Sequence, residues 1–171
     1  TSSLKSEDKC VAKCSSNEQA YKNCDENSRE LDNSKHIFID KSVISKFNEL
    51  WSQSFNANYS KRRELGLCLK ISNVSSKTPI IVDAMFAKMN DMECPMTDNN
   101  FGCPIEYADG RIHTHPCSQC CSLSLQDRGI FAEAEKADPG VPFFFGVICG
   151  QDQFRIFDHG IPFRPYAWSV V

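Results

Sequence analysis

The segment Ile112–Pro116 carries two histidines at a spacing that could bind a metal ion. In a β-strand, residues two apart point to the same side, so His113 and His115 would present their imidazoles to one point. Two such imidazoles suit Zn²⁺, which in catalytic sites takes a third protein ligand and keeps one position for water. Asp127, in the first turn of an expected helix, can return a carboxylate to that point. The pattern predicts one catalytic zinc held by His113, His115 and Asp127, with the Ser124 hydroxyl beside it.

Simpler interpretations of the same residues stay open. Ser124-x-x-Asp127 also fits a capping box, which only satisfies backbone N–H groups where a helix begins. A His-x-His pair can be two hydrogen-bonded histidines that bind no metal.

The cysteines after the histidines offer two further alternatives. Pro116-Cys117-x-x-Cys120 matches the Pro-Cys-x-x-Cys half of zinc nucleobase deaminases. That chemistry also needs a His-x-Glu, and none of the 4 histidines is followed by Glu at that offset. Cys117 could act as a nucleophile with His115, but in a chain with 10 cysteines a disulfide is the better default for each.

His113-x-His115-Pro116 followed by Ser124-x-x-Asp127 resembles the signature of the JAMM (MPN+/JAB) zinc metalloproteases. In that family an upstream Glu precedes His-x-His-Pro and Ser-x-x-Asp. Glu64 is the matching acid, 49 residues before His113 at the start of an expected strand. The resemblance covers residues 61–159. The segment between His115 and Ser124 is one residue longer than the usual family spacing, and Glu64 stands one residue nearer its glycine.

The resemblance implies a zinc-dependent peptidase or isopeptidase. His113, His115 and Asp127 would bind the zinc. Glu64 would act as general base and then general acid, and Ser124 would donate a hydrogen bond to the developing oxyanion. Family members often cleave isopeptide bonds to ubiquitin or similar proteins, so the expected partner is a protein or peptide substrate, including ubiquitin-like conjugates. The alternative is a catalytically inactive MPN-like module that binds a protein partner.

The elements that must position these residues can be predicted from periodicity. Apolar residues recur at three- and four-residue intervals in 40–58, which predicts an amphipathic helix with Asp40 as its N-cap. Short apolar runs predict strands at 65–72, 78–86, 111–114, 141–149 and 153–158. The first two are separated by a turn at 73–77, and the last two by a hairpin at Gly150. A loop is expected over 90–110, either functional or braced, and a helix over 124–136.

These elements predict an α+β fold: a single JAMM/MPN-like domain whose mixed, mostly antiparallel sheet is flanked by helices and braced by disulfides. Residues 1–35 are polar and contain three cysteines, which predicts an arm fastened by disulfides. The metallohydrolase domain would span 36–159. Residues 160–171 are expected to form an extended tail on the surface.

Composition narrows the function classes. The chain has 171 residues, enough for one domain, and 41% are hydrophobic, which argues against a disordered protein. The 19 Lys and Arg against 22 Asp and Glu give a net charge of −3, which argues against nucleic-acid binding. No apolar run reaches the roughly 18 residues of a membrane span. The 10 cysteines favour disulfides in an oxidising compartment, such as a secreted or periplasmic location, with the pairing left open.

Overall fold

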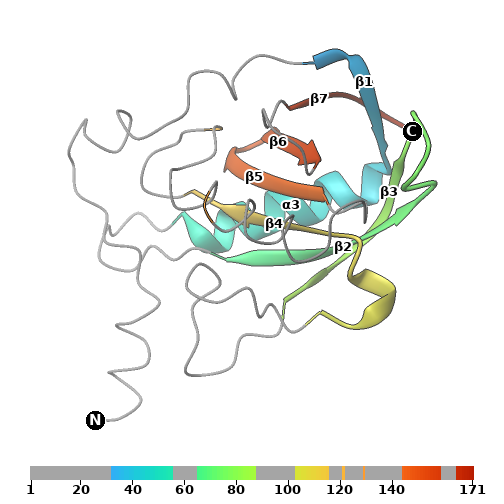
Figure 1. The fold of residues 1–171 in the computed structure, drawn as a ribbon. Coiled ribbons are helices and arrows are strands. Elements are labelled where there is room, and N and C mark those ends of the chain that lie inside the picture. The colour runs from blue at the N-terminus through green and yellow to red at the C-terminus, as the bar shows by residue number, and fades with distance from the viewer. Residues whose placement is uncertain are drawn as a thin grey trace, which may run out of the picture.

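Seven strands form one mixed sheet that curves around a helix (Figure 1). In this computed structural model the described residues are 32–55, 65–87, 103–115, 121, 129, 144–158 and 165–171. The elements with described bounds are β1 (Asp32–Ile39), α3 (Lys41–Ser54), β2 (Gly66–Ser72), β3 (Ile80–Phe86), the 3-10 helix η3 (Ile105–Tyr107), β4 (Gly110–Thr114), β5 (Phe144–Gly150), β6 (Gln153–Asp158) and β7 (Tyr166–Val170).

The strand order is β6-β5-β4-β2-β3-β1-β7. The β2–β3, β2–β4 and β5–β6 pairs are antiparallel, whereas β1–β3, β1–β7 and β4–β5 are parallel. The sheet is therefore mixed, as predicted, but the expected antiparallel majority is wrong. The two edge strands also approach each other, since Phe157 forms a bridge with Pro165 and the rings of Phe154 and Trp168 lie 4.6 Å apart. The sheet thus comes close to closing around α3.

Helix α3 begins where the sequence predicts. Asp40 caps it by accepting hydrogen bonds from the backbone N–H and the hydroxyl of Ser42, which lower the pKa of the Asp40 carboxyl. The helix ends at Ser54 rather than continuing to residue 58, because Phe55 has left the helical conformation. Its buried face consists of Val43, Phe47, Leu50, Trp51 and Ser54. These positions recur at three- and four-residue spacing and fill the hollow of the sheet.

The main core lies between α3 and the sheet face toward it. Strands from the whole sheet contribute, and its fully buried members include Ile37, Ile39, Leu67, Leu69, Ile81, Ile112, Ile148 and Ile156. Burying a side chain of this size, rather than leaving it exposed to water, stabilises the folded state by roughly 1.5–3 kcal/mol. Because strand residues alternate between faces, the neighbours of these residues point away from α3. We call the opposite side the second face, and define it by Cys68, Arg111, His113, His115, Phe145, Val147 and Cys149.

Two strands were not predicted from the sequence. β1 begins at Asp32, inside the segment expected to be a polar arm, and β7 lies in the segment expected to be a surface tail. They are parallel neighbours, with His36 opposite Ala167 and Ile39 opposite Val170. The C-terminal segment is extended, as expected, but it belongs to the sheet. The cysteines of the first 31 residues lie outside the described residues.

The remaining predicted strands are present with small shifts of their ends. β2 and β3 form an antiparallel pair joined by the predicted turn, where Asn73 has a φ of 57°. β5 and β6 form the predicted hairpin, where Asp152 has a φ of 56°. Asn and Asp tolerate this left-handed conformation better than most residues, which is why they occur at such turns. In the expected second helix, the one described residue, Gly129, is helical and exposed.

A polar cluster of Lys46, Asp83 and Tyr107 connects α3 to the sheet. The Lys46 ammonium lies 2.7 Å from Asp83 Oδ1 and also donates to the backbone oxygen of Ala84. Tyr107 of η3 donates to Asp83 Oδ2 at 2.5 Å. The hydrogen bond from Lys46, and after it the one from Tyr107, lower the pKa of Asp83 to about 2. The hydrogen bond between Tyr107 and Asp83 also raises the pKa of Tyr107. The cluster therefore joins α3, β3 and η3 through one ionised carboxylate.

Candidate functional site

His113 and His115 lie together on the second face, as strand alternation predicts. His113 is in β4 and His115 follows it, and the two side chains are only 5% and 6% exposed. Their Nε2 atoms lie 2.9 Å apart, so one Nε2–H donates to the lone pair of the other. The rings are tilted by 53° with centroids 4.8 Å apart. Two imidazole nitrogens thus converge on one point in a buried environment, and this donor pair is one that zinc accepts.

The residue between the histidines anchors the start of β2. Thr114 points toward α3 and is fully buried, and its Oγ1 lies 2.5 Å from Ser54 Oγ. Thr114 Oγ1 also accepts from the backbone N–H of Leu65 at 3.0 Å, while Leu65 O accepts from Thr114 N at 2.9 Å. Both the backbone N–H and the backbone C=O of Leu65 are therefore hydrogen-bonded to Thr114. The neighbour of Leu65 in the sequence is Glu64, the residue that the resemblance assigns as general acid and base.

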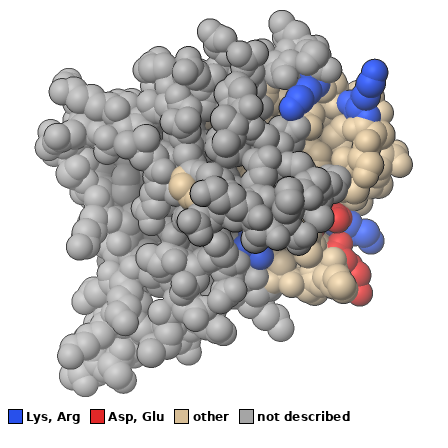
Figure 2. All heavy atoms as spheres, viewed as in Figure 1, with Lys and Arg blue, Asp and Glu red and all other residues tan. Residues whose placement is uncertain are grey.

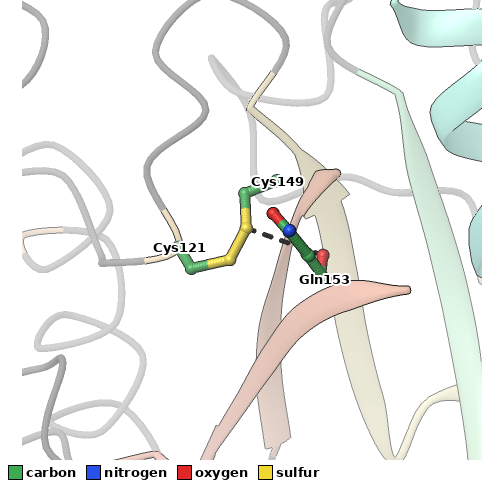
Figure 3. The surroundings of a disulfide bond; sticks show 3 residues. All are labelled: Cys121, Cys149 and Gln153. Carbon is green, nitrogen blue, oxygen red and sulfur yellow. Dashed lines mark hydrogen bonds between the residues drawn. A yellow bond between two sulfur atoms is a disulfide. The ribbon is translucent and has the colours of Figure 1, made fainter. Parts of the chain in front are cut away.

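A disulfide lies beside the histidines in the next strand. His115 donates its backbone N–H to Ile148 O at 2.9 Å, which places His115 next to Cys149 along the β4–β5 pair. Cys149 is bonded to Cys121, with Cα atoms 5.2 Å apart, and its Sγ lies 3.6 Å from the backbone oxygen of Gln153 (Figure 3). The disulfide fixes one residue of the segment that follows the histidines to the second face.

A second disulfide joins Cys68 of β2 to Cys103, with Cα atoms 5.7 Å apart. It braces the long loop that the sequence predicted between β3 and β4, at a point just before η3. Among the described residues no cysteine is free. Two disulfides indicate an oxidising compartment and confirm the expectation of disulfide bracing.

The charge near the histidines is basic on the described part of the second face. Arg111 lies two residues before His113 on the same side of β4, and burial lowers the pKa of its guanidinium, which nevertheless stays protonated at neutral pH. Elsewhere, the described surface seen in Figure 2 carries acidic and basic side chains near one another, without a broad patch of one sign. In the part of the chain that the structure describes, no helix is both long and apolar enough to cross a membrane.

The structure places two of the five predicted site residues. His113 and His115 are brought together, whereas Glu64, Ser124 and Asp127 lie outside the described residues, as do Cys117 and Cys120. Among the described side chains there is no group of three or more His, Cys, Asp or Glu that could hold a metal ion.

Sequence reasoning missed two features of this site. One is the anchoring of Leu65 by Thr114, for which a small β-branched hydroxyl residue between two histidines was the only local signal. The other is the disulfide partner of Cys149, for which the sequence carries no signal. In comparisons with known proteins, no family model matches the chain and no curated protein sequence matches it significantly.

Proposed function

We propose that this protein is a JAMM-like zinc-dependent peptidase or isopeptidase. The observation that carries the proposal is the convergence of His113 Nε2 and His115 Nε2 at 2.9 Å, in buried positions at the end of β4 and directly ahead of Pro116. Neutral imidazoles in this arrangement fit a zinc ion, and a strand offers a rigid base for them. Asp127 is the proposed third ligand.

The register of β2 and β4 supports the proposed role of Glu64. Gly66 pairs with His113, and Leu65 exchanges hydrogen bonds with Thr114. Continued by one residue, this antiparallel register would set position 64 opposite His115, and residues directly opposite share a face. Glu64 would then stand on the second face with both imidazoles. Gly66, opposite His113, has no side chain that could intervene.

The proposed chemistry divides among the residues of this chain. Bound zinc would polarise the attacked carbonyl and lower the pKa of its water to about 7. Glu64 would take a proton from the attacking water and deliver it to the leaving amine, which is general acid–base catalysis worth roughly 10²–10⁴ in rate. Ser124 would donate a hydrogen bond to the oxygen on which negative charge develops. His113, His115 and Asp127 would bind and orient the metal.

Elemental analysis of zinc per folded chain tests the ligand set. We expect about one zinc in the wild type after reconstitution, and much less in His113→Ala and Asp127→Ala. His36→Ala is the matched control, because His36 lies on β1 and bonds Ser169 Oγ at 2.8 Å, so its loss should leave zinc content unchanged. Loss of zinc in the control variant as well would mean that the assay reports folding rather than ligation.

Hydrolysis is tested separately from metal binding. Glu64→Gln should keep its zinc and lose at least a hundredfold in amide hydrolysis, since the amide cannot accept the proton. Suitable substrates are quenched-fluorescence peptides and isopeptide-linked ubiquitin dimers. If Glu64→Gln hydrolyses them as fast as the wild type does, the proposed general base is wrong.

A protein-binding module without catalysis is the second candidate, and one observation favours it. The Nε2–Nε2 hydrogen bond gives the Nε2 atom of each imidazole a partner without a metal, so the contact between the two rings does not itself require zinc. This function is preferred if the folded wild type takes up no zinc even after reconstitution. Partner binding would then be insensitive to chelators.

A further inference from the structure

We propose that Asn73 is an N-glycosylation site, so that the protein carries an oligosaccharide on the turn between β2 and β3. This inference does not depend on the function proposed above. Asn73-Val74-Ser75 has the acceptor sequence Asn-x-Ser/Thr, in which x is any residue except proline. Three-residue sequences of this kind also occur by chance, and the structure around the asparagine therefore decides whether the folded protein can carry a glycan there.

The structure presents both ends of the acceptor sequence to solvent. Asn73 and Ser75 are exposed, whereas Val74 between them is partly buried and packs against the hydrophobic core. The turn follows the last residue of β2, at the end of the sheet where the C-terminus lies, and Asn73 has a φ of 57° (Figure 1). Val74 thus fastens the turn to the core, while the asparagine and the hydroxyl residue that an oligosaccharide transferase recognises stay on the surface.

The carboxamide of Asn73 is available for modification. Among the described residues its side chain makes no hydrogen bond, and the two bonds from Ser76 N and Ser76 Oγ both end on its backbone oxygen, each at 2.9 Å. Asn48 is different, because its carboxamide donates to Asp152 Oδ1 at 2.8 Å and accepts from Asp152 N at 2.9 Å. A glycan on Asn73 would therefore break no hydrogen bond that the structure describes.

The two described disulfides favour a compartment in which this modification takes place. Disulfides form in the oxidising lumen of the endoplasmic reticulum, among other compartments, and the lumen also holds oligosaccharides carried on a lipid diphosphate. In the transfer, the Asn73 amide nitrogen forms a bond to the anomeric carbon of the oligosaccharide and gives up one proton. The bond from that carbon to the diphosphate oxygen breaks, and the lipid diphosphate leaves with the electron pair. Nothing is oxidised or reduced.

The point of attachment lies far from the histidine pair. Gly66, the first residue of β2, pairs with His113, and Asn73 follows the last residue of this strand of 7 residues. At about 3.3 Å per residue, the two ends of β2 are roughly 20 Å apart. The glycan would therefore add a bulky, solubilising group at the end of the sheet away from the histidines.

Peptide mapping of the protein isolated from the cells that naturally produce it tests the proposal. Peptide N-glycosidase in water enriched in heavy oxygen converts a glycosylated asparagine to an aspartate that carries one heavy oxygen atom. We expect this label at Asn73, and no such label in a sample left without the enzyme. An Asn73 peptide found only in its unmodified form would overturn the proposal. The other Asn-x-Ser sequence, Asn58-Tyr59-Ser60, lies outside the described residues, and mapping by peptide separates the two positions.

Variants secreted from cultured animal cells separate the acceptor sequence from the shape of the turn. Ser75→Ala should abolish the glycan at Asn73 although the asparagine is still present, and Ser75→Thr should keep it. Ser76→Ala is the matched control, because it removes the next hydroxyl of the same turn and should leave the glycan in place. Ser75→Ala is a better test than Asn73→Gln, since Asn tolerates the left-handed conformation of residue 73 better than most residues do. Retention of the glycan in Ser75→Ala, or its equal loss in Ser75→Ala and Ser76→Ala, would overturn the assignment.

Discussion

Replacing Thr114 by Val tests whether the hydroxyl between the histidines holds α3, β4 and the start of β2 together. Valine keeps the shape of threonine and replaces its hydroxyl by a methyl group, which can neither donate nor accept a hydrogen bond. In the protein that oxygen accepts from Leu65 N at 3.0 Å and lies 2.5 Å from Ser54 Oγ. Both hydroxyl-bearing residues are fully buried, so water cannot replace the lost partner in the folded state.

The expected loss follows from the number of hydrogen bonds. Each of the two hydrogen bonds of Thr114 Oγ1, with Leu65 N and with Ser54 Oγ, contributes about 1 kcal/mol to the free energy of unfolding. Leaving a buried donor without this acceptor costs about 1 kcal/mol more. Thr114→Val should therefore lower the free energy of unfolding by about 2–3 kcal/mol. Ser54→Ala leaves the Leu65 contact intact and should cost about 1 kcal/mol. Thr114→Ser keeps the hydroxyl and removes one methyl group, for about 1 kcal/mol.

Urea unfolding followed by far-UV circular dichroism and by the fluorescence of the two tryptophans, Trp51 and Trp168, measures these changes, with the disulfides kept oxidised. The Thr114→Val/Ser54→Ala double variant completes a thermodynamic cycle, in which we expect a coupling energy of about 1 kcal/mol between the two hydroxyls. A loss below about 0.5 kcal/mol for Thr114→Val, or no coupling in the cycle, would refute the argument that this contact organises the site.

Three further perturbations probe the frame around the site. Loss of the Cys121–Cys149 disulfide, which has a sequence separation of 28, should lower the free energy of unfolding measured in urea by about 3.6 kcal/mol. Loss of Cys68–Cys103, with a separation of 35, should lower it by about 3.8 kcal/mol. If the two losses differ by more than about 2 kcal/mol, the chain-entropy argument is wrong. Gly146→Ala should cost about 1–3 kcal/mol in the same assay, because its Cβ would lie 2.7 Å from Ile112 Cγ1 in the core. Gly150→Ala, which meets the exposed side chain of Gln153, should cost under about 1 kcal/mol, and equal losses at the two glycines would disprove the packing argument. The pKa of Asp83 is about 2 in the folded protein against 3.8 in the unfolded chain, so its stabilisation is present above pH 3.8 and is lost as the pH falls towards 2. Because Lys46 and Asp83 are 36% and 37% exposed, screening limits this to about 1 kcal/mol, and Asp83→Asn should lose that amount at pH 7 and show a flatter stability between pH 4 and pH 2. An unchanged pH profile in Asp83→Asn would rule out this linkage.

Local pattern was sufficient for those parts of the fold that depend on local spacing. Asp40 and the apolar stripe of α3 lie within a few residues of one another, so the sequence indicates both where the helix begins and which face it buries. The convergence of His113 and His115 likewise depends only on the two-residue period of a strand. The β5–β6 hairpin is another local feature, because its turn is two residues long.

Features that depend on distant pairing could not be predicted in this way. In β1 only Ile37 and Ile39 give the alternating apolar pattern of a strand with one buried face. The strands that pair with it, β3 and β7, lie far along the chain. The proline-containing C-terminal segment gives little strand signal of its own. Nor does spacing indicate that Cys121 pairs with Cys149, since ten cysteines permit many pairings. These contacts depend on how the whole sheet is assembled and not on local residue spacing.

The pairing of β1 with β7 also sets an order of events during synthesis. His36 and Ser169, which bond across these strands, are 133 residues apart. At roughly 5–20 residues per second, a ribosome delivers β7 on the order of 7–27 s after β1. Through this interval β1 can pair with β3 but keeps its other edge unpaired, and such an edge can recruit strands from other chains. Binding of that edge by a chaperone would protect the nascent protein until its last strand arrives.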